Sequence, residues 1–259
     1  MTFCRRSVEP SQRADQGYRG FVAPPVVLVH GWGGSFASTW QRSGFTELIA
    51  DLGRSVIGVD LLGHGEAPKP HEPEAYADLG ARIIEHLPDE PVDAVGFSLG
   101  AMTLLRVATQ QPHRFRRLVL AGIGENVLRA DDGAGERIAT AVDGNADDSD
   151  THALLFAQYA HQPGNDPTAL AAIMRRPRQP FTLDELASAT CSTLVVIGDK
   201  DFAGPGDPLV AALPNASLTV LRAGGSVAWL CPTTLVAEQQ FHVIVQSQRQ
   251  GSRRYPQTP

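Results

Sequence analysis

A serine lies inside a glycine-rich turn near the middle of the chain. Residues 96–100 read GFSLG, which places Ser98 at the centre of a GxSxG pattern between an apolar run at 92–95 and a helix-like run at 101–111. A serine on a sharp strand-to-helix turn exposes its hydroxyl, and its neighbours must be small because other backbone crowds the turn. The pattern therefore predicts that Ser98 is a nucleophile for acyl transfer; the alternative interpretation is a structural turn without chemistry.

Two backbone N–H groups are candidates for binding the negative oxygen that such an attack creates. Trp32 follows His30 and Gly31 at the end of the first apolar run, where an exposed loop can turn an N–H inward. Leu99 directly follows Ser98 and supplies the second N–H. We expect Trp32 and Leu99 to form an oxyanion hole, in which one donor contributes about 3 kcal/mol to the rate.

The elements that must position these groups alternate between short apolar runs and helix-sized stretches. Short, wholly apolar runs are typical of strands buried on both faces, and strands that alternate with helices imply a parallel sheet. The sequence therefore predicts an α/β fold with a doubly wound, mostly parallel sheet. The predicted strands are 26–29, 55–59, 92–95, 117–121, 194–197 and 218–221, and the predicted crossover helices are 45–52, 73–87 and 101–111.

The alternation lapses in one long stretch, residues 123–181, which is rich in Ala, Asp and Gly and has helical patches at 151–160 and 168–175. Because a structureless loop of that length is uncommon in a compact domain, we expect a helical cap that covers the carboxyl edge of the sheet and selects the substrate. The expected organisation is an N-terminal arm (1–23), a core (24–122 and 182–245), the cap (123–181) and a polar tail (246–259).

Composition excludes several other classes of protein. The 259 residues are 42% hydrophobic and carry a formal net charge of -6, which argues against a nucleic-acid partner. No segment approaches the roughly 20 apolar residues of a membrane span, and the N-terminus lacks the apolar run of a signal peptide. We expect a cytoplasmic protein with a small-molecule substrate, no membrane partner, no metal and no cofactor; the oligomeric state is not predictable.

Four motifs in collinear order resemble the α/β-hydrolase family, of the compact type with a helical cap. They are HGW at 30–32, DLLGHGEAP at 60–68, GFSLG at 96–100 and VVIGDKD at 195–201, and the resemblance covers about residues 24–222. It implies an α/β-hydrolase fold and cleavage of an ester, thioester or related carbonyl bond in a small, partly apolar molecule. A serine nucleophile disfavours the dehalogenases and epoxide hydrolases of this family, which attack with a carboxylate.

The resemblance also assigns roles to an acid and two histidines. Asp201 occupies the position of the triad acid, whose task is to hold an imidazole tautomer and stabilise the imidazolium. Asp199 and Asp207 are the alternative acids. His30 and His64 match positions that support the oxyanion loop and shape the pocket, so a structural role is expected for both.

The catalytic histidine of the family is missing from its expected place. It belongs in the loop after the last strand, where this chain has Ser226. Serine has no group with a pKa near neutral, so it cannot serve as the base, and the family logic predicts a loss on the order of 10⁶ in turnover. The next histidine is His242, about ten residues beyond Pro232.

Three explanations for this departure are open. His242 could reach the site through an unusual conformation of the tail, the chain could bind a ligand without turnover, or the segment from about residue 223 could have been altered by substitution or a shifted reading frame. Two functional alternatives to a serine hydrolase follow. One is a catalytically inactive binding protein, and the other is a cofactor-free lyase or synthase in which Ser98 acts as a base.

Overall fold

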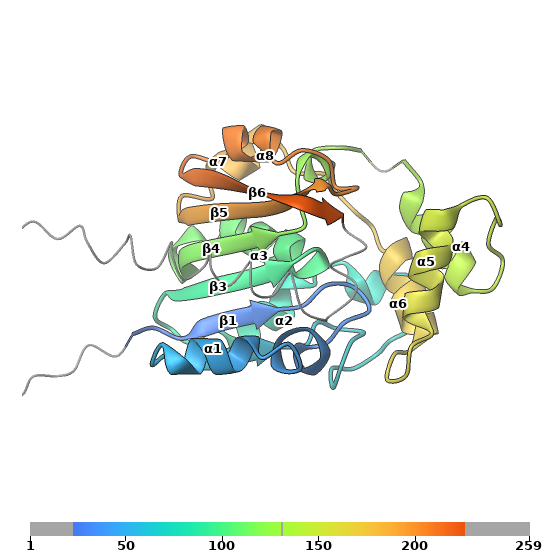
Figure 1. The fold of residues 1–259 in the computed structure, drawn as a ribbon, viewed down its shortest axis with the longest axis horizontal. Coiled ribbons are helices and arrows are strands. Elements are labelled where there is room, and N and C mark those ends of the chain that lie inside the picture. The colour runs from blue at the N-terminus through green and yellow to red at the C-terminus, as the bar shows by residue number, and fades with distance from the viewer. Residues whose placement is uncertain (1–22, 131, 226–259) are drawn as a thin grey trace, which may run out of the picture.

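A six-stranded parallel sheet forms the centre of the computed structural model, which describes residues 23–130 and 132–225. The strand order is β2-β1-β3-β4-β5-β6, and Figure 1 shows β1 and β3 to β6 in this order. The prediction of a doubly wound, mostly parallel sheet is confirmed, and each of the six predicted apolar runs coincides with a strand. The strands are β1 (Val26–Val29), β2 (Val56–Val59), β3 (Val92–Phe97), β4 (Phe115–Ala121), β5 (Ser192–Lys200) and β6 (Ala216–Gly225).

Strand β1 is apolar at every position because both of its faces are buried. Val27 and Val29 belong to one hydrophobic layer, whereas Val26 and Leu28 belong to another, and none of the four side chains is more than 5% exposed. Successive side chains of a strand point to opposite faces, so the two layers lie on the two sides of the sheet. A strand covered on both faces needs no polar positions.

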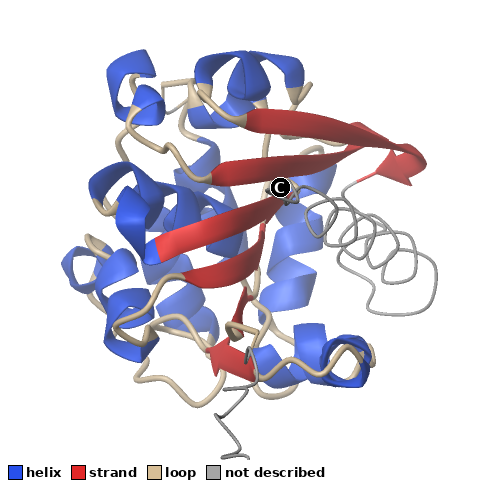
Figure 2. Cartoon of the chain, turned by 90° about the vertical axis from the view of Figure 1, so that its left-hand side faces the viewer, coloured by secondary structure: helices blue, strands red, loops and turns tan. Residues whose placement is uncertain are grey.

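Helices supply the covering on both sides. Phe45 at the start of α1 packs into the layer that holds Leu28, whereas Leu104 of α3 packs into the layer that holds Val27. Figure 2 shows the twist of the sheet and the helices packed along it. The helices next to the sheet are α1 (Phe45–Asp51), α2 (Gly80–His86), α3 (Leu99–Gln110), α7 (Leu183–Ala187) and α8 (Asp207–Ala212), and shorter helical turns occur at Ala37–Gln41, Pro73–Tyr76, Pro112–Arg114 and Glu125–Val127.

The stretch predicted as one helix at 73–87 is two pieces, a 3₁₀ turn at Pro73–Tyr76 and then α2. The Asp78 carboxylate accepts a hydrogen bond from the Ala81 N–H at 3.1 Å. A short acidic side chain that bonds the backbone in this way competes with a continuing helix and favours a new start.

Three further helices form a segment of their own beyond the carboxyl ends of the strands (Figure 1). We name α4 (Ala134–Val142), α5 (Thr151–Ala160) and α6 (Pro167–Arg175) the three-helix segment. Asp150 and Asp166 cap the last two helices, because their carboxylates accept hydrogen bonds from the N–H groups of Ala153 and Ala169. The helical patches at 151–160 and 168–175 are thus found as expected, and α4 is an addition that the sequence did not indicate.

The strand order reverses next to β1, since β2 lies on one side of it and β3 on the other. Val29 pairs with both Val59 and Gly96, so the carboxyl ends of these three strands are nearly level. In open parallel sheets, ligands bind in the crevice outside the carboxyl ends at such a reversal. A ligand site is therefore expected at the loops after β1 and β3.

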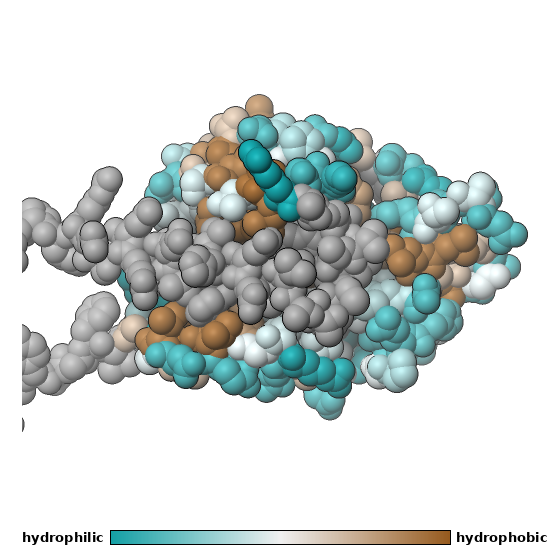
Figure 3. Space-filling model, viewed as in Figure 1, coloured by the Kyte–Doolittle hydropathy of each residue, from teal (hydrophilic) through white to brown (hydrophobic). Residues whose placement is uncertain are grey.

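No helix within residues 23–130 and 132–225 is long and apolar enough to cross a bilayer. In the view of Figure 3 the outer rim of the described surface is mostly polar, and an apolar area lies on the three-helix segment.

Candidate active site

Ser98 lies at the junction of β3 and α3 in a backbone conformation that few residues adopt. Its φ is 49° and its ψ is -110°. Every other described residue with a positive φ is a glycine. The turn is fixed on both sides, because the Ser98 N–H donates to the Ala121 carbonyl at 2.8 Å and the Ser98 carbonyl accepts from Met102 N–H at 2.9 Å. A side chain held in this region costs on the order of 1–3 kcal/mol, and such strain gathers at functional sites.

The second glycine of the GxSxG motif is required by a close approach of backbone. A Cβ on Gly100 would collide with the carbonyl oxygen of His30 at the end of β1. The start of α3 can therefore sit against the loop that contains Trp32 only if position 100 is glycine. This contact brings the segments after β1 and after β3 together.

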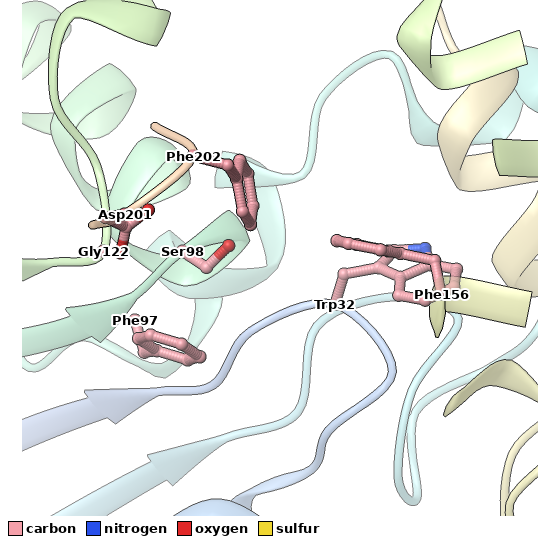
Figure 4. A pocket seen from close by; sticks show the side chains of 7 residues that line it. All are labelled: Trp32, Phe97, Ser98, Gly122, Phe156, Asp201 and Phe202. Atoms are coloured by element: carbon pink, nitrogen blue, oxygen red, sulfur yellow. The ribbon is translucent and has the colours of Figure 1, made fainter. Parts of the chain in front are cut away.

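Ser98 opens into a pocket with largely aromatic walls (Figure 4). Its hydroxyl oxygen points toward the space between Phe202 and Trp32. The Trp32 ring packs on Phe156 of α5 with centroids 5.2 Å apart, so the three-helix segment forms part of the wall. The pocket is lined by Trp32, Phe97, Ser98, Gly122, Phe156, Asp201 and Phe202.

Asp201 follows β5 directly and lines the same pocket. One carboxylate oxygen, Oδ1, accepts a hydrogen bond from the Ala203 N–H at 2.9 Å. The other, Oδ2, is buried and has no hydrogen-bond partner among the described residues. Burial raises the pKa of Asp201 above its ordinary value, because a charge is poorly solvated there. The alternative acids, Asp199 and Asp207, are exposed and do not line the pocket.

His30 and His64 are both buried. The His30 Nε2 accepts a hydrogen bond from Leu61 N–H at 3.1 Å, so its Nδ1 carries the proton and donates to the Gly31 carbonyl at 2.7 Å. Burial lowers the pKa of His30 and lowers the pKa of His64 well below the usual range. Both nitrogens of His30 are thus bonded to backbone, an arrangement that supports the loop rather than moving protons.

The two residues on which the identity of the base depends, Ser226 and His242, lie outside the described residues, as does the polar tail 246–259 and all but the last residue of the N-terminal arm. His152, which has no partner at metal-ligand spacing in the sequence, lies beside the pocket. The His152 ring lies 4.8 Å from the rings of both Phe156 and Phe202.

The aromatic wall was the part of the site that the sequence reasoning missed. Phe97 and Phe202 are immediate neighbours of Ser98 and Asp201, so adjacency to the motif residues was an available signal. Phe156 gave none, because it comes from a helical patch with no motif.

Comparison with known proteins identifies a family and several curated relatives, each of which matches part of the chain. The family described as alpha/beta hydrolase fold matches residues 24–154. A pimeloyl-[acyl-carrier protein] methyl ester esterase of Neisseria meningitidis is 37% identical over 111 residues, which are 41% of this chain and 40% of that protein. Esterase Rv0045c of Mycobacterium tuberculosis is 32% identical over 114 residues, which are 42% of this chain and 36% of that protein. Each match thus spans less than half of the curated relative.

A solved structure extends the likeness to most of the chain at the level of fold. The putative non-heme bromoperoxidase BpoC of Mycobacterium tuberculosis has a TM-score of 0.66 and 19% sequence identity, with 86% of this chain and 91% of that chain covered.

Proposed function

The chain belongs to the α/β-hydrolase family, and from that premise we propose that it is a serine hydrolase that cleaves an ester, thioester or related carbonyl bond of a small, partly apolar molecule. The observation that carries the proposal is that Ser98 and Asp201 both line one pocket. Ser98 has a strained backbone, and Asp201 has a buried carboxylate oxygen without a hydrogen-bond donor among the residues that the structure describes. The two curated relatives described above are named as esterases, which agrees with this class of reaction.

In the proposed reaction the Ser98 Oγ attacks the carbonyl carbon of the substrate. The new O–C bond makes a tetrahedral oxyanion, which the N–H groups of Trp32 and Leu99 bind. Collapse expels the alcohol or thiol with a proton and leaves an acyl-enzyme, which water then hydrolyses.

Two features support the donors assigned here. Leu99 is the first residue of α3, so its N–H has no acceptor within the helix. Trp32 N–H has no hydrogen-bond acceptor in the described part of the chain.

Asp201 is proposed to orient the group that takes the proton from Ser98. A buried carboxylate oxygen without a donor is costly, and an imidazole N–H is the donor that this chemistry requires. Because Ser226 stands where the family places that imidazole, we propose that turnover is slow and depends on the oxyanion hole and substrate binding.

The pocket walls support a substrate that is apolar next to the reacting bond. Phe97, Phe156 and Phe202 line it with Trp32, and the polar side chains among its lining residues are Ser98 and Asp201. Aromatic walls bind apolar groups, and the Asp201 carboxylate disfavours a nearby anion. We propose that the three-helix segment, which supplies Phe156, is the cap that selects this group.

The test is ester hydrolysis by the wild type and by Ser98→Ala, with p-nitrophenyl acetate, butyrate and phenylacetate as probes. Ser149→Ala is the matched control, since that hydroxyl bonds to Asp147 in an exposed turn away from the pocket. We expect wild type and the control to hydrolyse the esters alike and Ser98→Ala to be slower than both, because it lacks the attacking hydroxyl but keeps the oxyanion hole and the binding pocket. Equal rates in all three proteins would contradict the proposal.

The second candidate is a binding protein without turnover, and the serine at position 226 favours it. Saturable binding of an apolar ester, detected by calorimetry, together with no Ser98-dependent hydrolysis, would establish it in place of the enzyme.

A further inference from the structure

The loop after β1 is a tight turn with Trp32 and Gly33 at its centre, and we name residues 31–34 the Trp32 loop. Gly34 N–H donates to the Gly31 carbonyl at 3.1 Å and closes the turn. Gly33 has a φ of 72°, which other residues rarely adopt. The direction of Trp32 N–H is therefore set by how this turn is held.

Asn165, in the connection between α5 and α6, bonds across to this loop. Its Nδ2 donates to the Gly33 carbonyl at 3.0 Å and to the Tyr159 carbonyl at 3.1 Å. Both acceptors are carbonyl oxygens, so the NH₂ group and not the amide oxygen must face them, and both of its protons are used. One side chain thus ties the end of α5 to a core loop 132 positions earlier in the chain.

The three-helix segment makes two further contacts with the Trp32 loop. The Trp32 Nε1 donates to the Leu170 carbonyl of α6 at 3.1 Å. The Tyr159 ring lies directly on Gly33, where a Cβ would come within 2.7 Å of it. Of these contacts, the one from Asn165 is a side-chain hydrogen bond to the backbone of the loop.

We propose that Asn165 is a positioning residue that holds the Trp32 loop against the three-helix segment and keeps the Trp32 N–H aimed at the oxyanion. This inference rests on the proposed function. The Gly33 carbonyl and the Trp32 N–H belong to one short turn, so releasing the carbonyl lets the turn rotate and moves the N–H. A displacement of about 1 Å at a catalytic group lowers a rate on the order of a hundredfold.

The test compares three variants. Asn165→Ala removes both hydrogen bonds, and Asn165→Asp keeps the shape but places carboxylate oxygen against two carbonyls. Asn145→Ala is the matched control in the connection between α4 and α5, because the Asn145 Nδ2 donates to the nearby Asp143 carbonyl and to no core loop of the described residues.

Hydrogen exchange of a peptide that contains Gly34 tests whether Asn165 holds the Trp32 loop. We expect this peptide to exchange at least about tenfold faster in Asn165→Ala and Asn165→Asp, because the bonded Gly34 N–H reports an open turn. Asn145→Ala should match wild type. Unchanged exchange in both Asn165 variants would overturn the proposal.

Hydrolysis of p-nitrophenyl butyrate then decides whether the held loop serves catalysis. The expected result is a kcat about tenfold to a hundredfold lower in Asn165→Ala with KM changed less than about threefold, since an oxyanion contact acts in the transition state. A changed KM with an unchanged kcat would contradict positioning. A wild type without Ser98-dependent hydrolysis would sink the proposed function and the catalytic role together, whereas the exchange result would still show whether Asn165 holds the loop.

Discussion

The indole nitrogen of Trp32 donates a hydrogen bond to the carbonyl of Leu170 at 3.1 Å, although the two residues are 138 positions apart. Trp32 belongs to the loop after the first strand, and Leu170 belongs to α6. The bond joins the segment proposed to select the substrate to a loop proposed to stabilise the transition state. A shift of α6 on binding a substrate would therefore move the Trp32 loop as well.

Trp32→Phe should cost stability and slow the reaction, because it removes this bond and leaves the Leu170 carbonyl without the indole donor. The expected loss is about 1 kcal/mol in the free energy of unfolding. Trp40→Phe is the matched control: Trp40 is also buried and packs on a Phe ring at 5.0 Å, but its Nε1 has no hydrogen-bond partner among the described residues. Urea denaturation should show the larger loss in Trp32→Phe. Equal losses would mean that the hydrogen bond contributes nothing.

Ser98→Gly should stabilise the fold. Glycine accepts a φ of 49° without strain, and the relief of about 1–3 kcal/mol exceeds the extra chain entropy of glycine, so we expect a net gain of about 1 kcal/mol. Ser98→Ala keeps the Cβ and with it the strain, so its stability should stay near that of wild type. Urea denaturation of the two variants measures the difference, and a Ser98→Gly protein no more stable than Ser98→Ala would show that the turn is unstrained.

The fold was predictable where burial dictates the sequence. The apolar run of β1 matched its strand residue for residue, since both faces are covered. The ends of β5 were not predictable, because exposed residues such as Ser192 and Lys200 extend the strand through backbone pairing alone. Helix α4 escaped notice because it is short and alanine-rich, with Gly135 inside it packed against the Met174 carbonyl of α6.

The site was predictable only where a motif marks it. GFSLG indicated Ser98 and its turn, and the residues after β5 indicated Asp201. Phe156 and Asn165 reach the site through packing of the three-helix segment, which no local pattern encodes. The contact between Gly100 and the loop after β1 is likewise a property of the assembled sheet.

Asp201→Asn should stabilise the protein more at pH 7 than at pH 4. Burial raises the pKa of Asp201 in the folded state above its ordinary value near 3.8, so stability is lost as the pH rises through that raised pKa and the buried carboxyl loses its proton. An uncharged amide avoids this loss.

Urea denaturation at several pH values tests this pH dependence of stability. It compares wild type with Asp201→Asn and with Asp199→Asn, a control at an exposed site. A stability difference between wild type and Asp201→Asn that stays constant from pH 4 to pH 7 would contradict it.

Ser226→His should raise ester hydrolysis by at least about tenfold, because an imidazole with a pKa near neutral can take the proton from Ser98. Addition of Asp201→Asn to this variant should remove most of the gain, since the imidazole then loses the carboxylate that holds its tautomer. A folded Ser226→His protein without any gain would place the segment after β6 elsewhere than at the pocket.

Mass spectrometry after treatment with a fluorophosphonate tests most directly whether Ser98 is a nucleophile. We predict that one adduct forms on wild type, slowly because Ser226 stands where the family places its imidazole, and that it lies on the peptide that contains Ser98; we predict none on Ser98→Ala. An unmodified Ser98 peptide in the folded wild type, or equal labelling of wild type and Ser98→Ala, would contradict the assignment of Ser98.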